Sequence, residues 1–220
     1  MSQPPTERAR VHRHPERGAY DRATIDAVLD EALICHVAWV GDDEAPRLLP
    51  TIHACVGDTV YLHGSRGARP WKALRDGTEV CLAATIVDGL VLARSAFNHS
   101  MNYRSVVVFG RAREVTEPDE LLVAARAITE HVAPGRSADA RMPTDDEFRQ
   151  TLLLAVPLDE ASAKVRTGPP KDDEQDVGLP IWAGVLPLGT EIGDPEAAPD
   201  LTGDLEVPPY IAAYRRPGTT

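Results

Sequence analysis

Short runs with strand composition follow one another across two-residue turns, and this pattern restricts the chain to an antiparallel sheet. Residues 46–56 (PRLLPTIHACV) and 59–64 (TVYLHG) are separated only by the dipeptide Gly57-Asp58. A dipeptide of this kind between two apolar runs is typical of a tight hairpin. A further run, 78–95 (TEVCLAATIVDGLVLARS), contains a similar signal at Asp88-Gly89. We therefore expect strands that pair with their sequence neighbours, as in an antiparallel barrel.

The other patterns add strands to this sheet and helices at its edges. Strand composition recurs at 34–40, 103–116, 160–168 and 179–188, and Gly110 is a candidate bulge. Helical spacing or helix-start signals predict helices at 20–33 (capped by Asp21 or Thr24), 68–76, 117–132 (Pro118 in its first turn) and 143–156 (opened by Thr144). The expected fold is mainly β with peripheral helices, an antiparallel split β-barrel. Residues 1–19 are expected to form a mobile arm, 20–190 the domain and 191–220 an extended tail.

Composition excludes several classes of partner. The net charge is −11 and the basic residues are scattered, which argues against nucleic acid, because such partners require a basic face. No apolar run approaches the ~18–20 residues of a membrane span. The first twenty residues contain no apolar core of a secretory signal, so a cytoplasmic location is expected.

Cysteine and histidine spacing does not indicate a metal site. Cys35, Cys55 and Cys81 lie in apolar runs without a CxxC motif, which is typical of reduced core thiols. The pair His12-x-His14 has no thiol or carboxylate at ligand spacing beside it, so a surface arm is the favoured interpretation.

The loop at 63–69 (HGSRGAR) indicates a phosphate site. It follows a strand and precedes a helix, so backbone N–H groups, a hydroxyl and guanidinium groups converge there. Arginine suits this task because its planar group binds phosphate oxygens in pairs. A strand-to-helix turn with solvated arginines is the alternative, since the loop matches neither a Walker nor a Rossmann motif.

The order of several segments resembles the pyridoxamine 5′-phosphate oxidase-like superfamily of flavin-nucleotide-binding split barrels. These segments are PRLLPT (46–51), VYLHGSRGAR (60–69), VCLAAT (80–85), NYRSVVVFGRAREV (102–115) and WAGVLPL (182–188). Within that superfamily the likeness is to the branch that contains nitroimidazole-resistance-type proteins. The resemblance implies bound FMN, a homodimer with the site between two subunits, and a small-molecule substrate.

The same resemblance implies roles for individual residues. Arg69 stands where the family keeps a basic residue on the phosphate, while Ala68 replaces a second one, for which Arg66 or Lys72 could compensate. Arg104 and Ser105 match a family strand that reaches the phosphate, and Trp182 matches a tryptophan near the flavin. The complete expected cofactor set is Leu48, Pro50, Thr51, Leu62, His63, Gly64, Ser65, Arg66, Arg69, Lys72, Arg104, Ser105 and Trp182.

The reaction is less constrained than the cofactor. His99, Asn102 and Tyr103 lie between two strands and are either substrate groups over the flavin or a polar turn. The C-terminal segment with which the family's oxidases bind pyridoxal phosphate is not found in VPPYIAAYRRPGTT, so that activity is not expected. An FMN-dependent oxidoreductase of a small or aromatic substrate is the first hypothesis. A flavin-binding or sensing protein without turnover is the second. A barrel that binds haem or a deazaflavin is the third, and haem would require an axial histidine such as His63 or His99.

Overall fold

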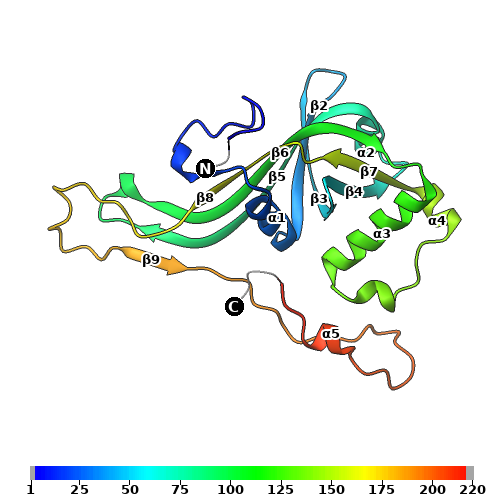
Figure 1. The fold of residues 1–220 in the computed structure, drawn as a ribbon. Helices are drawn as coiled ribbons and strands as arrows, with labels where there is room; N and C mark the ends of the chain where they lie inside the picture. The colour runs from blue at the N-terminus through cyan, green and yellow to red at the C-terminus, as the bar shows by residue number, and fades with distance from the viewer. Residues whose placement is uncertain (1–2, 217–220) are drawn as a thin grey trace.

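The computed structural model describes residues 3–216, which form one curved antiparallel sheet with helices on its outside (Figure 1). The strands are β1 (Gly18–Ala19), β2 (Ile34–Val40), β3 (Pro46–Val56), β4 (Thr59–Ser65), β5 (Asp76–Leu92), β6 (Ser100–Glu114), β7 (Thr151–Pro157), β8 (Glu160–Arg166) and β9 (Gly184–Pro187). The helices are α1 (Arg22–Glu31), α2 (Arg69–Leu74), α3 (Pro118–Val132), α4 (Asp145–Gln150) and α5 (Pro209–Ala212), with 3₁₀ turns at Pro15–Arg17, Ala96–Asn98 and Arg136–Ala138.

The strand order closes the sheet into a barrel, as the sequence predicted. The order is β1-β8-β6-β7-β4-β3-β2-β5-β9, and β5 also pairs with β6. The strands β6, β7, β4, β3, β2 and β5 therefore form a ring, while β1, β8 and β9 extend it at its open side. The long β5–β6 ladder runs well beyond the ring and forms a projecting arm, which lies at the left of Figure 1.

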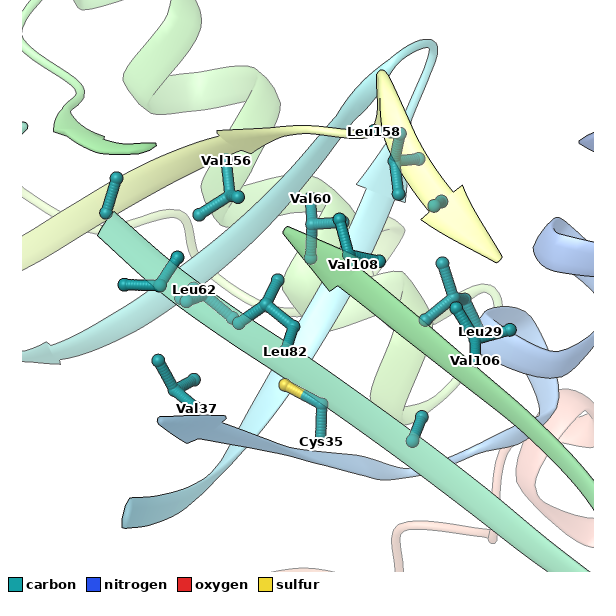
Figure 2. Packing of buried hydrophobic residues seen from close by; sticks show 14 of the residues in the cluster. Leu29, Cys35, Val37, Val60, Leu62, Leu82, Val106, Val108, Val156 and Leu158 are labelled. Carbon is teal, nitrogen blue, oxygen red and sulfur yellow. The ribbon is translucent and has the colours of Figure 1, made fainter. Parts of the chain in front are cut away.

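The barrel interior is a continuous apolar core. Alternate residues of each strand point inward, as Val37 and Leu62 do, and helix α1 covers one end with Val28 and Leu29. Figure 2 shows these side chains meeting those of β5, β6 and β7. Burial of this apolar surface is the main stabilising contribution, on the order of 25 cal/mol for each Å².

A second apolar layer lies on the outer face of β3, β4 and β7. It contains Ala54, Tyr61 and Leu153, which pack against Ala124 and Ile128 of α3. The amphipathic sequence of α3 accounts for this position, because one of its faces is apolar. Helix α4, opened by a capping box between Thr144 and Glu147, lies beside α3.

The predicted hairpin at Asp88-Gly89 is wrong. Strand β5 continues through this dipeptide to Leu92, and only a register irregularity between Val87 and Gly89 marks it. The chain reverses instead at 93–99. Strand β9 explains the glycine, because a Cβ on Gly89 would lie 3.0 Å from the carbonyl oxygen of Leu186.

Two other element predictions are also wrong. The predicted helix 143–156 ends at Gln150, and Thr151–Pro157 is strand β7, because its apolar run is buried on both faces. Gly110 pairs in regular register with Val80 and forms no bulge. Its Cβ would lie 2.8 Å from Cγ1 of Val156, so close packing requires the glycine.

The terminal segments differ in how they contact the barrel. In the N-terminal segment, Arg8 forms ion pairs with Glu79 and Glu160, and β1 pairs with β8. The chain after β9 is largely exposed until Arg216, which is 8 % exposed. No helix in the described part of the chain has both the length and the apolar character needed to cross a membrane.

Candidate functional site

The predicted phosphate loop joins β4 to α2. Strand β4 ends at Ser65, and α2 begins at Arg69 with Pro70 in its first turn. The backbone N–H of Ala68 donates to the carbonyl of Ser65 at 3.0 Å, which closes the turn. The strand–loop–helix geometry that the sequence predicted is therefore present.

Gly64 has a packing role in this loop. A Cβ on Gly64 would lie 2.0 Å from Cε2 of Trp71, whose indole is buried. The glycine lets the first turn of α2 lie directly on β4. This contact positions Arg69, two residues before Trp71, at the rim of the barrel.

Arg66 and Arg69, the two arginines of the loop, line different cavities. Arg66 forms an ion pair with Glu114 at 2.7 Å and lines a cavity between α3 and α4. Arg69 lines a separate cavity with Leu48 and Arg47 of β3. The loop thus does not bring Arg66 and Arg69 to one point, although it brings Arg69 and Leu48 together.

The cavity at Arg69 has a volume of about 310 Å³. Its walls are Trp39, Gly41, Asp42, Asp43, Arg47, Leu48, Leu49, Arg69, Pro70 and Ala73. Arg47 forms an ion pair with Asp43 at 2.6 Å, whereas Arg69 has no ion-pair partner among residues 3–216. Arg69 is therefore a cation available to a ligand, while Arg47 is already neutralised.

Further residues of the predicted flavin set lie on β3, β4 and α2. Leu48, Pro50 and Thr51 alternate along β3, so Leu48 and Pro50 share the outer face while Thr51 points to the other face. Leu62 is fully buried in the barrel core, and only its backbone could contact a ligand. Lys72 lies on the exposed side of α2.

Arg104 and Ser105 point to opposite faces of β6. The guanidinium of Arg104 bonds to both carboxylate oxygens of Glu31 on α1 and to Asp88, and these bonds raise its pKa. The hydroxyl of Ser105 donates to the carbonyl of Lys164 at 3.3 Å on the outer face. Strand alternation therefore prevents both side chains from reaching the same phosphate from one subunit.

The predicted substrate residues lie on the projecting arm. Nδ1 of His99 bonds to the carbonyl of Ser95 at 2.9 Å, which leaves Nε2 without a partner in the described chain. Asn102 is buried and accepts a hydrogen bond from Arg166. Tyr103 pairs with Arg166 across β6 and β8. Nε2 of His99 and the hydroxyl of Tyr103 therefore have no hydrogen-bond partner among the described residues.

Trp182 lies beside the projecting arm and is not among the residues that line the cavity at Arg69. Gly184 pairs with Leu92, and the Trp182 ring lies over Gly184, where a Cβ would be 2.9 Å away. The indole is 68 % exposed. A flavin at the Arg69 rim of one subunit could meet Trp182 only from another subunit or after a rearrangement of the arm.

His63 differs from the other side chains in the loop. It lies on β4 opposite Leu153, on the same face as Tyr61 and therefore in the layer beneath α3. Its Nδ1 is buried without a hydrogen-bond partner. Desolvation alone lowers its pKa, so the imidazole is neutral and uncommitted at neutral pH.

Sequence reasoning missed a cluster at the other end of α3. The rings of His53 and His131 contact each other with centroids 4.7 Å apart. Arg216 donates to the carbonyls of Asp30 and Glu31 at the end of α1, at 2.6 Å and 3.0 Å, and to that of His131 at 2.7 Å. No local pattern in the sequence connects residues this distant, so only the fold shows the cluster.

The cysteines agree with the expectation of core thiols. Cys35 is 1 % exposed, and all three thiols are free. Burial raises the pKa of Cys35 and Cys55 to about 12, which keeps both protonated and unreactive.

Comparison with known proteins connects this geometry to a family. The profile of the family described as pyridoxamine 5′-phosphate oxidase matches residues 21–165. A search of curated proteins found no match.

Solved structures extend the similarity to nearly the whole chain. The flavocytochrome Anf3 from Azotobacter vinelandii is 36 % identical, with a TM-score of 0.90 over 98 % of this chain and 100 % of that one. A FAD and haem binding protein from Mycobacterium smegmatis is 35 % identical, with a TM-score of 0.84 over 89 % and 95 % of the two chains.

A third structure shares the fold alone. It is described as a 5-nitroimidazole antibiotic resistance protein from Bacteroides thetaiotaomicron, and it is 23 % identical, with a TM-score of 0.57 over 67 % of this chain and 86 % of that one. The family profile, the closed barrel and the whole-length relatives agree: the chain belongs to the pyridoxamine 5′-phosphate oxidase family of split barrels.

Proposed function

We propose that this protein binds a flavin nucleotide and a haem and acts as a redox protein. The observation that carries the proposal is similarity over almost the whole chain to a flavocytochrome, at 36 % identity. The relative from Mycobacterium smegmatis, described as binding FAD and haem, supports the same pair of cofactors. It also favours FAD over the FMN that the sequence resemblance implied.

The rim cavity fits the phosphate end of a flavin. It combines apolar walls, such as Trp39 and Leu48, with Arg69, a cation without an ion-pair partner in the described chain. A guanidinium of this kind binds phosphate oxygens strongly. The cavity of about 310 Å³ is at the small end of the range for ligand pockets, which is consistent with a site completed by a second subunit.

A homodimer is part of the proposal. The outer face of the sheet carries Ile34, Val40, Leu48 and Val87, which are 48 %, 65 %, 65 % and 40 % exposed. Strand register places all four on one face. Exposed apolar side chains on one face of a sheet support an interface with a second copy, which is also what the proposed contact between Trp182 and the flavin requires. Sedimentation of the wild type and of an Ile34→Asp variant tests this, since the aspartate should shift the protein toward monomer.

The haem requires an axial imidazole, and the structure leaves two histidines from the sequence prediction with an unpartnered ring nitrogen. These are His63 and His99. A bound flavin supplies hydride and electron transfer, and a bound haem supplies one-electron chemistry, while the protein supplies position and electrostatics. Oxidoreductase activity on a small molecule follows from these cofactors as the proposed role.

The first test is the absorbance spectrum of the purified protein, followed by identification of the released cofactors after denaturation. We expect a flavin spectrum together with a haem Soret band, and release of FAD. A flavin spectrum without haem, even after incubation with haemin, would contradict the flavocytochrome assignment. A protein that takes up neither cofactor would contradict the whole proposal.

The Arg69 assignment has its own test. Arg69→Ala should weaken flavin binding by roughly 1.5–3 kcal/mol, the range for a charge-assisted hydrogen bond. Arg111→Ala is the matched control, since Arg111 pairs with Glu79 on the surface of the sheet far along β6. Equal flavin retention in the two variants would remove Arg69 from the site.

A further inference from the structure

Another cavity lies where strands β2 and β5 separate from each other. Within residues 3–216, the pairing between these strands ends at Ala38 and Cys81. Beyond that pair, β2 continues beside β3 as far as Val40, while the first part of β5 runs beside β6. The space between the two strands is a cavity of about 500 Å³, and residues 38–40 and 78–81 line it. We call this cavity the β2–β5 gap.

The side chains around the β2–β5 gap are mainly apolar. Val40, Pro46 and Phe109 are the large apolar residues in its wall. Ala38 and Cys81 lie where the strands meet, and their small side chains leave the adjoining space unfilled. The volume is within the range of pockets that hold small organic molecules. The gap therefore has room for a flat heterocycle and a sugar.

Backbone groups of both strands face the gap. In an antiparallel strand, the N–H and C=O groups of successive residues point to alternate edges. One of Trp39 and Val40, and one of Glu79 and Val80, therefore direct backbone groups toward the gap. In the described chain, no backbone–backbone hydrogen bond outside the sheet ladders reaches these four residues. The gap thus offers hydrogen-bond donors and acceptors to the polar edge of a heterocycle.

The charged side chains at the gap are already paired. Arg47 forms an ion pair with Asp43 at 2.6 Å. Glu79 forms ion pairs with Arg8 and Arg111. A charged ligand would have to compete with these pairs, whereas a neutral ligand would leave them intact. The charges therefore favour a neutral heterocycle such as a nucleoside base.

The β2–β5 gap adjoins the cavity at Arg69. Both cavities have Trp39 and Arg47 in their walls. The cavity at Arg69 measures about 310 Å³ and holds the guanidinium that has no ion-pair partner in the described chain. FAD is FMN joined through its phosphate to adenosine monophosphate. A protein that binds FAD therefore needs room for a nucleoside beside its site for the FMN phosphate, and the gap lies beside that cavity.

We infer that the β2–β5 gap binds the adenosine part of FAD, with the adenine against the apolar wall and its polar edge on the backbone groups of the two strands. The inference rests on the proposed function, since it extends the flavin site at Arg69. Its consequence is a preference for FAD over FMN, because only FAD carries a group that fills the gap.

The first experiment measures the affinity of the cofactor-free protein for FAD and for FMN by flavin fluorescence. We expect the wild type to bind FAD roughly tenfold more tightly than FMN, which corresponds to about 1.4 kcal/mol. Cys81→Trp should fill the gap and remove this preference, and its affinity for FMN should stay unchanged.

Ala83→Trp is the matched control. Ala83 is also half-buried, lies two residues further along the same face of β5 and is not in the wall of the gap. An effect on a dimer that uses the outer face of the sheet would act on both variants. The control should therefore keep the preference for FAD, and circular dichroism checks that both variants fold.

The outcomes separate this inference from the proposed function. If the wild type binds neither FAD nor FMN, the flavin part of the proposed function fails, and the inference fails with it. If the wild type binds both with equal affinity, the flavin site stands and the inference alone is overturned. An equal preference for FAD in Cys81→Trp and Ala83→Trp, or an equal loss of it, would also overturn the inference.

A second experiment uses the wild type and does not depend on the folding of a variant. Adenosine is added to the FMN-loaded and to the FAD-loaded protein, and its binding is measured by saturation-transfer NMR. We expect adenosine to bind the FMN-loaded protein, in which the gap is open, and not the FAD-loaded protein. The absence of binding to both forms, or equal binding to both, would overturn the assignment of the gap.

Discussion

His53 and His63 lie on adjacent strands of the same sheet, yet they differ in burial and in the hydrogen bonds of their imidazole rings. His53 is fully buried, bonds to the carbonyl of Leu29 and contacts the ring of His131. The imidazole of His63 is half-buried and forms no hydrogen bond within the described chain. Burial lowers the pKa of both imidazoles, to about 4 for His53, so both are neutral at pH 7.

The difference shows what each histidine contributes. The His53 region holds together α1, α3 and the C-terminal segment, because Arg216 binds the carbonyls at the ends of both helices. The His63 region offers an imidazole with no hydrogen-bond partner in the described chain. Nδ1 is buried without a hydrogen-bond partner in both rings, and the two differ at Nε2, which is bonded in His53 and has no partner in the described chain in His63.

The largest effect we expect is a loss of stability in acid that originates at the His53 region. The lowered pKa of His53 and that of His131 mean that the folded protein excludes protons that the unfolded chain binds below about pH 6.5. Stability should therefore be complete above pH 6.5 and fall as the pH decreases toward 4. For His53 alone the loss of stability is about 3 kcal/mol, because its pKa falls from 6.5 to about 4 on folding and each pKa unit corresponds to about 1.4 kcal/mol.

Urea unfolding from pH 7.5 to 4.5 measures this loss. Asp30, Glu130, Arg126 and Arg216 face the same region, and Asp30, whose pKa is raised by desolvation, opposes the trend. A His53→Leu variant is the control, because it should flatten part of the pH dependence. An identical pH profile in the variant would show that the acid effect arises elsewhere.

The next effect concerns Arg216. Arg216→Gln should destabilise the protein by roughly 2–3 kcal/mol, because carbonyls at the ends of α1 and α3 lose a charged donor. Arg215→Gln is the matched control, since the exposed Arg215 bonds only to the carbonyl of its neighbour Tyr214. Its cost should stay within about 0.5 kcal/mol. Chemical denaturation measures the free energy of unfolding of both variants. Equal values for Arg216→Gln and Arg215→Gln would mean that Arg216 does not hold the C-terminal segment.

The smallest effect sharpens the comparison directly. His53→Leu at pH 7.5 should cost about 1–3 kcal/mol, because the carbonyl of Leu29 loses its partner. His63→Leu in the cofactor-free protein should change stability by less than about 0.5 kcal/mol, since it removes an imidazole with no bonds in the described chain. A large cost for His63→Leu in that form would reveal a structural role and contradict the comparison.

Local patterns predicted the fold where the signal lay within a few residues. The tight turn at Gly57-Asp58 and the helix start at Thr144 are present, and of the two candidate caps, Asp21 and Thr24, the cap is Asp21. The pattern failed at Asp88-Gly89, where a turn dipeptide lies inside a strand because β9 packs closely beside it. It failed again at 151–156, where burial on both faces makes a strand look like part of a helix.

The candidate site divides in the same manner. The strand-to-helix loop at 63–69 could be recognised from residue types. The family resemblance added the prediction that it binds the phosphate of a flavin nucleotide. The separation of Arg66 from Arg69, and of Arg104 from Ser105, could not be predicted, because side-chain direction depends on register and on the packing of Trp71 against Gly64.

The sequence by itself determined that this protein is an antiparallel barrel with peripheral helices and cysteines in its apolar runs, because hairpin, capping and burial signals act over short distances. Only the tertiary structure decided which histidines are committed. His53 meets His131 and the carbonyl of Leu29 across large separations in the chain, while the imidazole of His63 has no hydrogen-bond partner within residues 3–216. Whether a polar side chain has a hydrogen-bond partner depends on which residues the tertiary fold packs against it, and these residues are distant in the sequence.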